Sequence, residues 1–257
     1  MCLSPLLLNR EHWHRYVPCG RCPECVSLFS QIWALRCVLE AQGHKENCFL
    51  TLTYAEAPPE GVVKRDLQLF FKRLRRALGA EHPIRYFACG EYGKKGLRPH
   101  YHVLIFGWSP DDLEFFQTTS KNERLYRSPF IESLWTLGFS SVGELTYNSC
   151  KYASLYLQKF NRVPEGANKP FRLMSLKPGI GFEFITPRLL ESRGIYYRGV
   201  KYPIPRYFLE VLRRQGFDAD SYIAHRKEVT TSNKNHLAGR TPEERNKNFF
   251  KFFSKNS

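Results

Sequence analysis

The segment Pro99–Phe106, with the sequence PHYHVLIF, limits the fold of this chain more than any other feature. Its β-branched and aromatic residues predict a β-strand. Because successive side chains of a strand point to opposite faces, His100 and His102 should lie next to each other on one face. On the opposite face we expect core side chains, namely Tyr101, Val103 and Ile105.

A third polar side chain, Glu91, is expected to join the two histidines. The segment 84–91 also predicts a strand, and the glycine- and lysine-containing loop 92–98 favours a hairpin that returns the chain opposite it. Two imidazoles and one carboxylate can bind a divalent cation and leave positions open for water and phosphate oxygens. The alternative is that the histidines are only partly exposed and that Glu91 pairs with Lys94 or Lys95.

A pair of tyrosines follows further along the chain. The segment 148–160 predicts a helix that begins with an Asn or Ser cap. Tyr152, Tyr156 and Lys159 recur at i, i+4 and i+7, so they share one helical face. By itself this spacing is typical of a packed amphipathic stripe. Beside a metal-binding strand it suits phosphodiester cleavage, in which a tyrosine hydroxyl attacks phosphorus and Lys159 stabilises the developing charge.

The remaining hydrophobic periodicities complete the predicted elements. Further helices are expected at 26–42, from Asp66 to Leu78, near 111–117, near 129–137, and from a capping-box start at Thr241. Further strands are expected at 47–54 and 138–147.

This order of elements predicts an α+β fold with a central antiparallel sheet of about five strands flanked by helices. The chain is expected to divide into a cysteine-rich segment with a helix at 1–45, a nuclease core at 46–162, and a basic C-terminal extension at 163–257.

The chain has 8 cysteines and no segment typical of an export signal, so a reducing compartment with free or metal-bound thiols is expected. Cys19, Cys22 and Cys25 are separated by two residues each, and this gap lets thiolates converge on one ion. Candidates for a fourth ligand are Cys2, His12 and His14. A structural zinc, an iron–sulfur cluster and a set of reduced thiols beside a turn all remain open.

The charge of the chain indicates its class of partner. Its 39 Lys and Arg against 24 Asp and Glu give a net charge of +15, which favours a polyanion such as nucleic acid over a merely basic soluble protein. No apolar run is long enough to cross a bilayer, and no signal peptide is expected. The candidate phosphate contacts are Lys72, Arg73, Arg75, Arg76 and Arg98.

Taken together, these segments resemble the HUH endonucleases, in which a His-hydrophobic-His strand meets a tyrosine helix. The chain is more closely similar to the replication initiators of small single-stranded DNA bacteriophages of the microvirus group, particularly the gokushovirus type. The segments that carry the resemblance are Met1–Leu3, Pro18–Cys22, Leu52–Tyr54, Phe71–Leu74, Gly90–Gly93, Arg98–His102, Tyr152–Tyr156, Met174–Gly181 and Pro203–Tyr207.

The resemblance implies a rolling-circle initiator in the cytoplasm of a bacterial host. Such a protein nicks the viral strand of duplex DNA at the origin and leaves a 3′-hydroxyl for the host polymerase. Later it cuts and circularises the displaced single strand. By resemblance, His100, His102 and Glu91 would hold Mg²⁺ or Mn²⁺, and Tyr152 and Tyr156 would be alternating nucleophiles that form 5′-phosphotyrosine links. The family often carries paired lysines after its second tyrosine, whereas Phe160 follows Lys159 here.

The same residues leave two other functions open. A two-tyrosine HUH transposase shares the nicking chemistry, and a non-enzymatic, zinc-containing DNA-binding module would account for the charge and the cysteines. A conjugative relaxase fits poorly, because its third histidine and amino-terminal tyrosine have no counterpart. The segment Lys177–Gly181 does not match the Gly-x-x-x-x-Gly-Lys phosphate loop, so we expect no nucleotide cofactor and a host helicase for unwinding.

Overall fold

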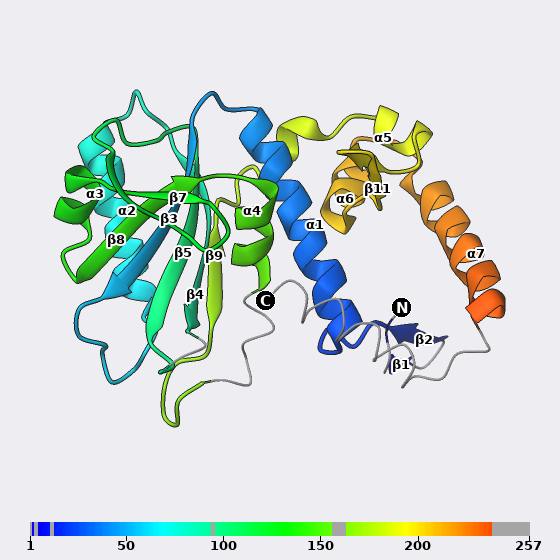
Figure 1. Cartoon of the computed structure of the whole chain (residues 1–257). Coiled ribbons are helices and arrows are strands. Elements are labelled where there is room, and N and C mark those ends of the chain that lie inside the picture. The colour runs from blue at the N-terminus through cyan, green and yellow to red at the C-terminus, as the bar shows by residue number, and fades with distance from the viewer. Residues whose placement is uncertain (1, 3–4, 11–12, 94–95, 156–162, 238–257) are drawn as a thin grey trace. The chain divides into compact units, whose positions relative to one another are not determined.

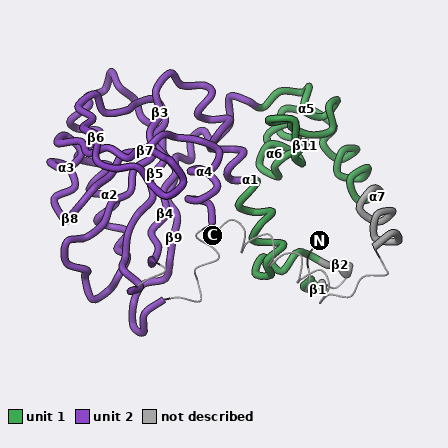
Figure 2. The backbone as a smooth tube through the Cα atoms, viewed as in Figure 1, with its two compact units in different colours: residues 1–32, 185–257 green, residues 33–184 purple. Residues whose placement is uncertain are grey.

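A computed structural model describes residues 2, 5–10, 13–93, 96–155 and 163–237 of the chain (Figure 1). The backbone divides into two compact units (Figure 2). Residues 33–184 form one, called the sheet unit, and residues 1–32 with 185–257 form the other, called the terminal unit. The helix predicted from Thr241 lies outside the described residues.

The sheet unit is built on a seven-stranded sheet in which all paired neighbours are antiparallel. The spatial order of the strands is β6-β7-β8-β3-β5-β4-β9. In chain order they are β3 (Asn47–Tyr54), β4 (Arg85–Tyr92), β5 (Pro99–Phe106), β6 (Glu114–Thr118), β7 (Arg124–Arg127), β8 (Gly138–Glu144) and β9 (Phe171–Met174). The predicted α+β class with a central antiparallel sheet is confirmed, with seven strands in place of about five.

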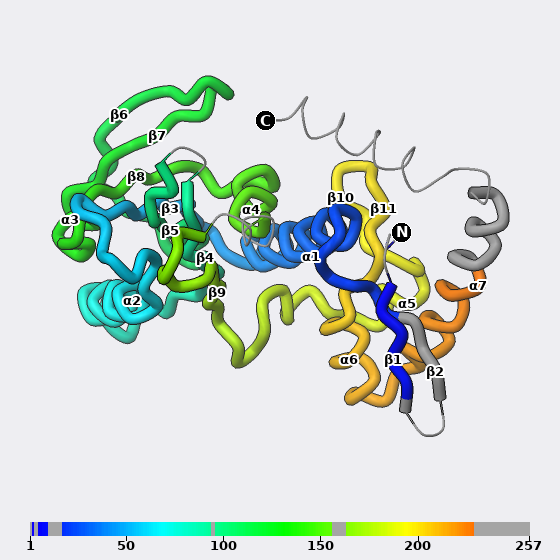
Figure 3. Tube along the Cα trace, turned by 90° about the horizontal axis from the view of Figure 1, so that it is seen from below, coloured from blue at the N-terminus to red at the C-terminus, as the bar shows by residue number. Residues whose placement is uncertain are grey.

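Different helices cover the two faces of this sheet. α2 (Lys64–Leu78) packs its buried residues into the cluster that contains the face of β5 predicted to be core. α4 (Tyr147–Ser154) contacts β4 and β5, and in the view along the strands it lies on the other side of them from α2 (Figure 3). The predicted packing of Tyr101, Val103 and Ile105 in the core is therefore confirmed.

The alternation of β3 shows how sequence sets these faces. Its buried residues are every second one, Cys48, Leu50, Leu52 and Tyr54, and they point to the α2 side. β5 is buried on almost its whole length, since helices cover both of its faces. On the α4 side, the Trp33 ring of α1 (Pro23–Gln42) lies 5.2 Å from that of Phe87 in β4.

A buried polar network fixes the turn at Lys177–Gly181 against α1. Arg36 donates from Nε to the Ile180 carbonyl at 3.0 Å, and the Gly181 N–H donates to Glu40 at 2.6 Å. Glu40 also pairs with Arg85 of β4. Because buried charges are tolerated when they are paired and hydrogen-bonded, this network joins the helix, the sheet and the turn.

The terminal unit contains the remaining elements. They are β1 (Leu6–Arg10), β2 (Trp13–Val17), the first part of α1, α5 (Arg188–Glu191), β10 (Ile195–Tyr197), β11 (Val200–Tyr202), α6 (Arg206–Arg214) and α7 (Ala219–Leu237). α6 buries Phe208, Leu209 and Leu212. β1 pairs only with β2, and β10 only with β11, so each forms a two-stranded sheet among the described residues.

The helix predicted near 111–117 is wrong, because this segment forms β6. Asp112, whose type favours a helix start, caps another helix: its carboxylate accepts from the Phe130 N–H at 2.7 Å in α3 (Pro129–Leu134). The Phe115 ring packs edge-on against Tyr126 of the partner strand β7. A pairing that is distant in sequence therefore overrides the local helical signal.

Helix ends also differ from their predicted positions. Asp66 is not the cap of α2, since the N-cap is Val63, and Asp66 instead accepts a hydrogen bond from the Tyr54 hydroxyl at 2.7 Å. α3 ends at Leu134 and β8 at Glu144, each three residues earlier than predicted. α4 begins at Tyr147, where the Thr146 and Ser149 side chains form a capping box.

The sheet unit extends beyond the nuclease core predicted at 46–162, because the second part of α1 and strand β9 belong to it. The functional division into three segments stays a prediction. Within the described residues, no helix combines the length and the apolar character needed to cross a membrane.

Replacing Tyr101 by Phe should destabilise the sheet unit. The buried Tyr101 hydroxyl accepts from the Val63 N–H at 2.8 Å and donates to the Val63 carbonyl at 2.9 Å. Its removal leaves these groups without that partner, at a cost of about 1–3 kcal/mol in the free energy of unfolding. Urea denaturation measures the change, and Tyr196→Phe, at a site 63% exposed, is the matched control. Equal effects of the two substitutions would contradict this assignment.

Candidate active site

The pairing of β5 with its two neighbours assembles a polar cluster on the α4 side of the sheet. Glu91 of β4 lies directly opposite His100. On the other side of β5, Thr51 of β3 lies opposite His102, and Thr53 lies opposite His100. Directly paired residues of antiparallel strands share a face, so these side chains all project to the same side. The predicted neighbourhood of Glu91, His100 and His102 is what the structure shows.

Three ligand atoms of the cluster form a nearly equilateral triangle. His100 Nε2 lies 3.1 Å from Glu91 Oε1 and 3.1 Å from His102 Nε2. The third side, from His102 Nε2 to Glu91 Oε1, is 3.2 Å. Glu91 and His102 are buried, whereas His100 is partly exposed. The open side of the triangle is therefore on the side of His100.

Backbone and side-chain partners orient the two rings. Nδ1 of His100 lies 3.0 Å from the carbonyl of Arg98, which can only accept, so this nitrogen carries the proton and Nε2 keeps its lone pair. Nδ1 of His102 lies 3.2 Å from the Thr51 hydroxyl, which can accept in the same way. The Phe49 ring stacks on His102 at 5.5 Å and limits its rotation. Such outer partners fix the tautomer of metal-binding histidines.

This donor set fits a divalent cation. In an octahedral site with bonds of about 2.1 Å, neighbouring ligand atoms lie about 3 Å apart, as the three atoms do here. Two imidazole lone pairs and a buried carboxylate converging at this distance repel one another unless a cation or a proton lies between them. Three ligands on one side leave positions for water and phosphate oxygens.

The first predicted tyrosine lies beside the cluster. α4 turns its buried residues, Cys150, Ala153 and Ser154, away from solvent. Tyr152 is 44% exposed, and its ring centroid lies 4.8 Å from that of His102 at an interplanar angle of 72°. Loss of hydration, with a further contribution from the Glu91 charge, raises the pKa of the Tyr152 hydroxyl to about 12. At neutral pH the phenol is therefore protonated.

The second predicted tyrosine, Tyr156, and Lys159 lie outside the described residues, as does the last part of the helix predicted at 148–160. α4 is described only to Ser154, with Leu155 as its C-cap. Their roles stay predictions.

The predicted phosphate contacts lie in two places. Lys72, Arg75 and Arg76 are exposed on α2, which covers the sheet face opposite to the histidines. Arg73, also on α2, donates to the Leu134 carbonyl, and Arg98 donates to the Tyr54 carbonyl. The structure therefore does not bring the α2 cations to the histidine cluster.

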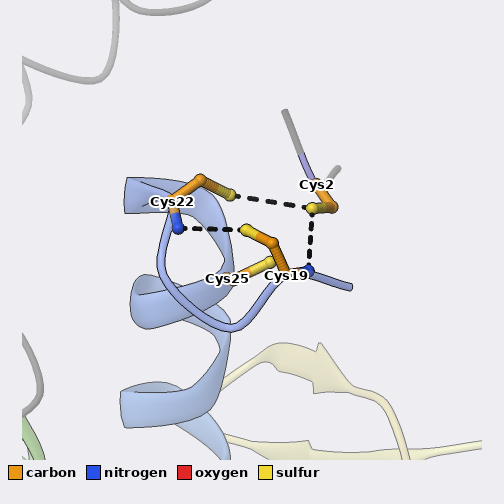
Figure 4. A group of neighbouring side chains, drawn as sticks. All are labelled: Cys2, Cys19, Cys22 and Cys25. Carbon is orange, nitrogen blue, oxygen red and sulfur yellow. Dashed lines mark hydrogen bonds between the residues drawn. The ribbon is translucent and has the colours of Figure 1, made fainter. Parts of the chain in front are cut away.

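The four cysteines at the start of the chain form a second cluster (Figure 4). The ligand atoms of Cys2, Cys19, Cys22 and Cys25 all lie within 4.8 Å of one another. Hydrogen bonds from the Arg21 and Cys22 N–H groups lower the pKa of the Cys19 thiol to about 6, while burial raises the pKa of Cys25 to about 12. His12 lies outside the described residues, and nothing is described of the His14 side chain.

Thr51 and Phe49 are site residues that the sequence analysis missed. Both lie on the strand predicted at 47–54, where the alternation of buried residues places Phe49, Thr51 and Thr53 on one face. Two threonines on that face, between strongly apolar residues, are the available signal. It could be used only by knowing that this strand is the neighbour of β5.

Comparison with known proteins gives a consistent set of similarities. A family model described as a replication-associated protein of the ORF2 type matches residues 47–161. Replication-associated protein VP4 of Bdellovibrio phage phiMH2K is 36% identical over 208 residues, which cover 74% of this chain and 65% of that protein.

Two further relatives are similar over most of the chain. Replication-associated protein ORF2 of Spiroplasma virus 4 is 31% identical, with 82% of this chain and 72% of the relative covered. Replication-associated protein ORF4 of Chlamydia phage 1 is 30% identical, with 83% and 59% covered. The chain thus spans about three fifths to three quarters of the length of these relatives. No solved structure matches it with significance.

Replacing Thr51 by Val should weaken binding of a divalent cation at the histidine cluster by about 10–100-fold, because His102 loses the partner that orients it. Titration with Mn²⁺, followed by electron paramagnetic resonance, measures the affinity. Thr51→Ser keeps the hydroxyl and should bind as the wild type does.

The matched control is Thr53→Val on the same face of β3, since the Thr53 hydroxyl donates to the Phe139 carbonyl at 3.3 Å. Wild-type affinity in Thr51→Val would show that Thr51 has no part in orienting the ligand.

Proposed function

Because the chain belongs to the family of phage replication-associated proteins, we propose that it is a DNA nickase that initiates rolling-circle replication of a single-stranded DNA phage. The observation that carries the proposal is the position of Tyr152, whose ring contacts His102 of the converging Glu91, His100 and His102 cluster. A nucleophile next to a Lewis-acid site is the arrangement that phosphodiester cleavage by tyrosine requires.

The residues at the site have distinct roles in the proposed reaction. Glu91, His100 and His102 would hold Mg²⁺ or Mn²⁺, which supplies polarisation of the scissile phosphate. The Tyr152 oxygen attacks phosphorus, and the P–O bond to the 3′ oxygen breaks as the new bond forms. The phenolic proton ends on the departing 3′ oxygen, so the products are a 5′-phosphotyrosine and a free 3′-hydroxyl. Since the raised pKa keeps the phenol protonated, proton loss has to accompany attack.

The phosphotyrosine link conserves the energy of the cleaved bond. A 3′-hydroxyl can therefore attack it and reseal the strand without a nucleotide cofactor. Tyr156, one turn after Tyr152 in the predicted helix, would make the second cut that releases a circular genome. Lys159 would stabilise the charge on phosphate during either step.

The proposed DNA contacts have to involve both sides of the sheet. The scissile single strand lies at the histidine face, whereas the exposed cations of α2 would hold duplex DNA by its phosphates. Strand separation and synthesis from the 3′-hydroxyl would be supplied by a host helicase and a host polymerase in the bacterial cytoplasm.

Incubation with labelled single-stranded origin DNA and Mn²⁺ should give a protein–DNA adduct that survives denaturation. The Tyr152→Phe, Tyr156→Phe double variant should give none, because both nucleophiles are removed. The single variants show whether the tyrosines are equivalent. Adducts are counted on denaturing gels with and without a chelator.

The matched control is Tyr147→Phe, which removes a hydroxyl from the first residue of the same helix and should keep the adduct. An adduct that persists in the double variant would exclude these nucleophiles. DNA binding by the wild type with no adduct would favour the non-enzymatic module, and preference for transposon ends over a phage origin would favour the transposase.

Neutralising the α2 cations in a Lys72→Gln, Arg76→Gln variant should weaken duplex binding and lower its salt dependence. The slope should fall by roughly 0.9 log units for each phosphate that no longer meets a cation. Adduct formation on saturating short single-stranded DNA should keep its rate, since α2 lies on the other face of the sheet. Lys72→Arg, Arg76→Lys is the charge-conserving control. A lower rate on the short strand would place α2 at the nicking site.

A further inference from the structure

The cysteine cluster joins two parts of the terminal unit that are separated in sequence. Cys19 and Cys22 lie in the turn before α1, and Cys25 lies in its first helical turn. Cys2 reaches them from the other end of the β1–β2 hairpin, and the Cys19 N–H donates to its sulfur at 3.2 Å. Figure 4 shows the four sulfur atoms turned toward a common centre.

The spacing of the sulfurs is that of ligands around one ion. Four thiolates at about 2.3 Å from a tetrahedral zinc lie about 3.8 Å from one another. The Cys2 and Cys22 sulfurs lie 3.9 Å apart, and all four lie within 4.8 Å. A disulfide would bring two of them to about 2.05 Å, and an iron–sulfur cluster would hold them farther apart than a single ion does.

Backbone donors match the charge that such a centre carries. The Arg21 and Cys22 N–H groups point to the Cys19 sulfur at 3.4 and 3.2 Å. N–H groups that donate to sulfur stabilise thiolates and orient them as ligands. The turn is therefore shaped for bound thiolates, not only for a loop that happens to contain cysteines.

The hairpin needs a support that its own packing does not supply. β1 and β2 form a separate two-stranded sheet, and such a pair is marginally stable in water. Leu6, Leu7 and Leu8 of β1 are 53%, 47% and 44% exposed, so this strand buries little apolar surface. In small structures of this kind, metal binding supplies the folding free energy that a core would provide.

We propose that Cys2, Cys19, Cys22 and Cys25 bind one structural Zn²⁺ that fastens the β1–β2 hairpin to the start of α1. Four thiols release their protons to solvent as they bind the ion, which leaves a tetrahedral centre with a net charge of −2. The site has four protein ligands and hence no open coordination position, so it takes no part in DNA cleavage.

Metal analysis of the full chain tests the stoichiometry. After dialysis against a weak chelator, the wild type should retain about one zinc per chain, as a closed four-thiolate site does. Cys22→Ser should lose most of it. Cys48→Ala, which alters a buried cysteine outside the cluster, and His102→Ala, which alters the other metal cluster, should retain it. Zinc retained in Cys22→Ser, or iron with acid-labile sulfide in the wild type, would overturn the proposal.

A measurement on the wild type avoids any effect of substitution on folding. Alkylation followed by peptide mass spectrometry should modify the four cluster cysteines only after a strong chelator removes zinc. The buried thiols, Cys37, Cys48, Cys89 and Cys150, should stay unmodified in both states. Equal alkylation of the cluster with and without the chelator would overturn the zinc site.

Hydrogen exchange tests the role of the ion. Chelation should remove amide protection from residues 6–10 and 13–17 while leaving that of β5 unchanged. Unchanged exchange in the hairpin would show that zinc does not hold it. Because neither readout involves DNA, failure here would leave the nicking proposal untouched.

Discussion

The pairing register of β5 with β4 and β3 is the constraint on which the rest of the structure depends. It places Glu91 opposite His100 and Thr51 opposite His102 in a single arrangement of three strands. A slip of one residue would turn both histidines toward α2 and bring Tyr101 to the face where the cluster now lies. The core contacts of Tyr101 oppose such a slip, so the packing that stabilises the sheet also sets the distances among the ligands.

The parts of this structure that follow from sequence are those encoded over short distances. A hairpin with a period of two is enough to place Glu91 across from His100. Thr51 escaped detection because it lies 51 residues from its partner, and no local pattern says which strand is the neighbour. The same limitation produced the helix predicted near 111–117, where pairing with β7 decides the structure. Cys2 was one of three candidate ligands, since the hairpin that returns it to Cys19 was not predicted.

The sheet separates the two chemical features that the sequence suggested would act together. The cations of α2 lie on the side of the hydrophobic cluster, and the ligand triangle lies on the other. On the latter side, the cross-strand row that runs from Glu91 through His100 and Thr53 ends at Phe139, which is 53% exposed. The surface beside the ligand cluster along this row is therefore aromatic, and the net charge of the chain does not describe it.

The order of the strands also explains why a tyrosine helix meets a histidine strand at all. Four antiparallel pairings separate β8 from β9 and two separate β3 from β4, so each of these pairs runs parallel and needs a crossover connection. Both connections move across the sheet in the same direction, yet they leave from strands that point oppositely. Right-handed crossovers must then pass over opposite faces, which puts α2 on one side and α4 on the other. The chirality of the backbone thus brings Tyr152 to the histidines before any contact between their side chains is made.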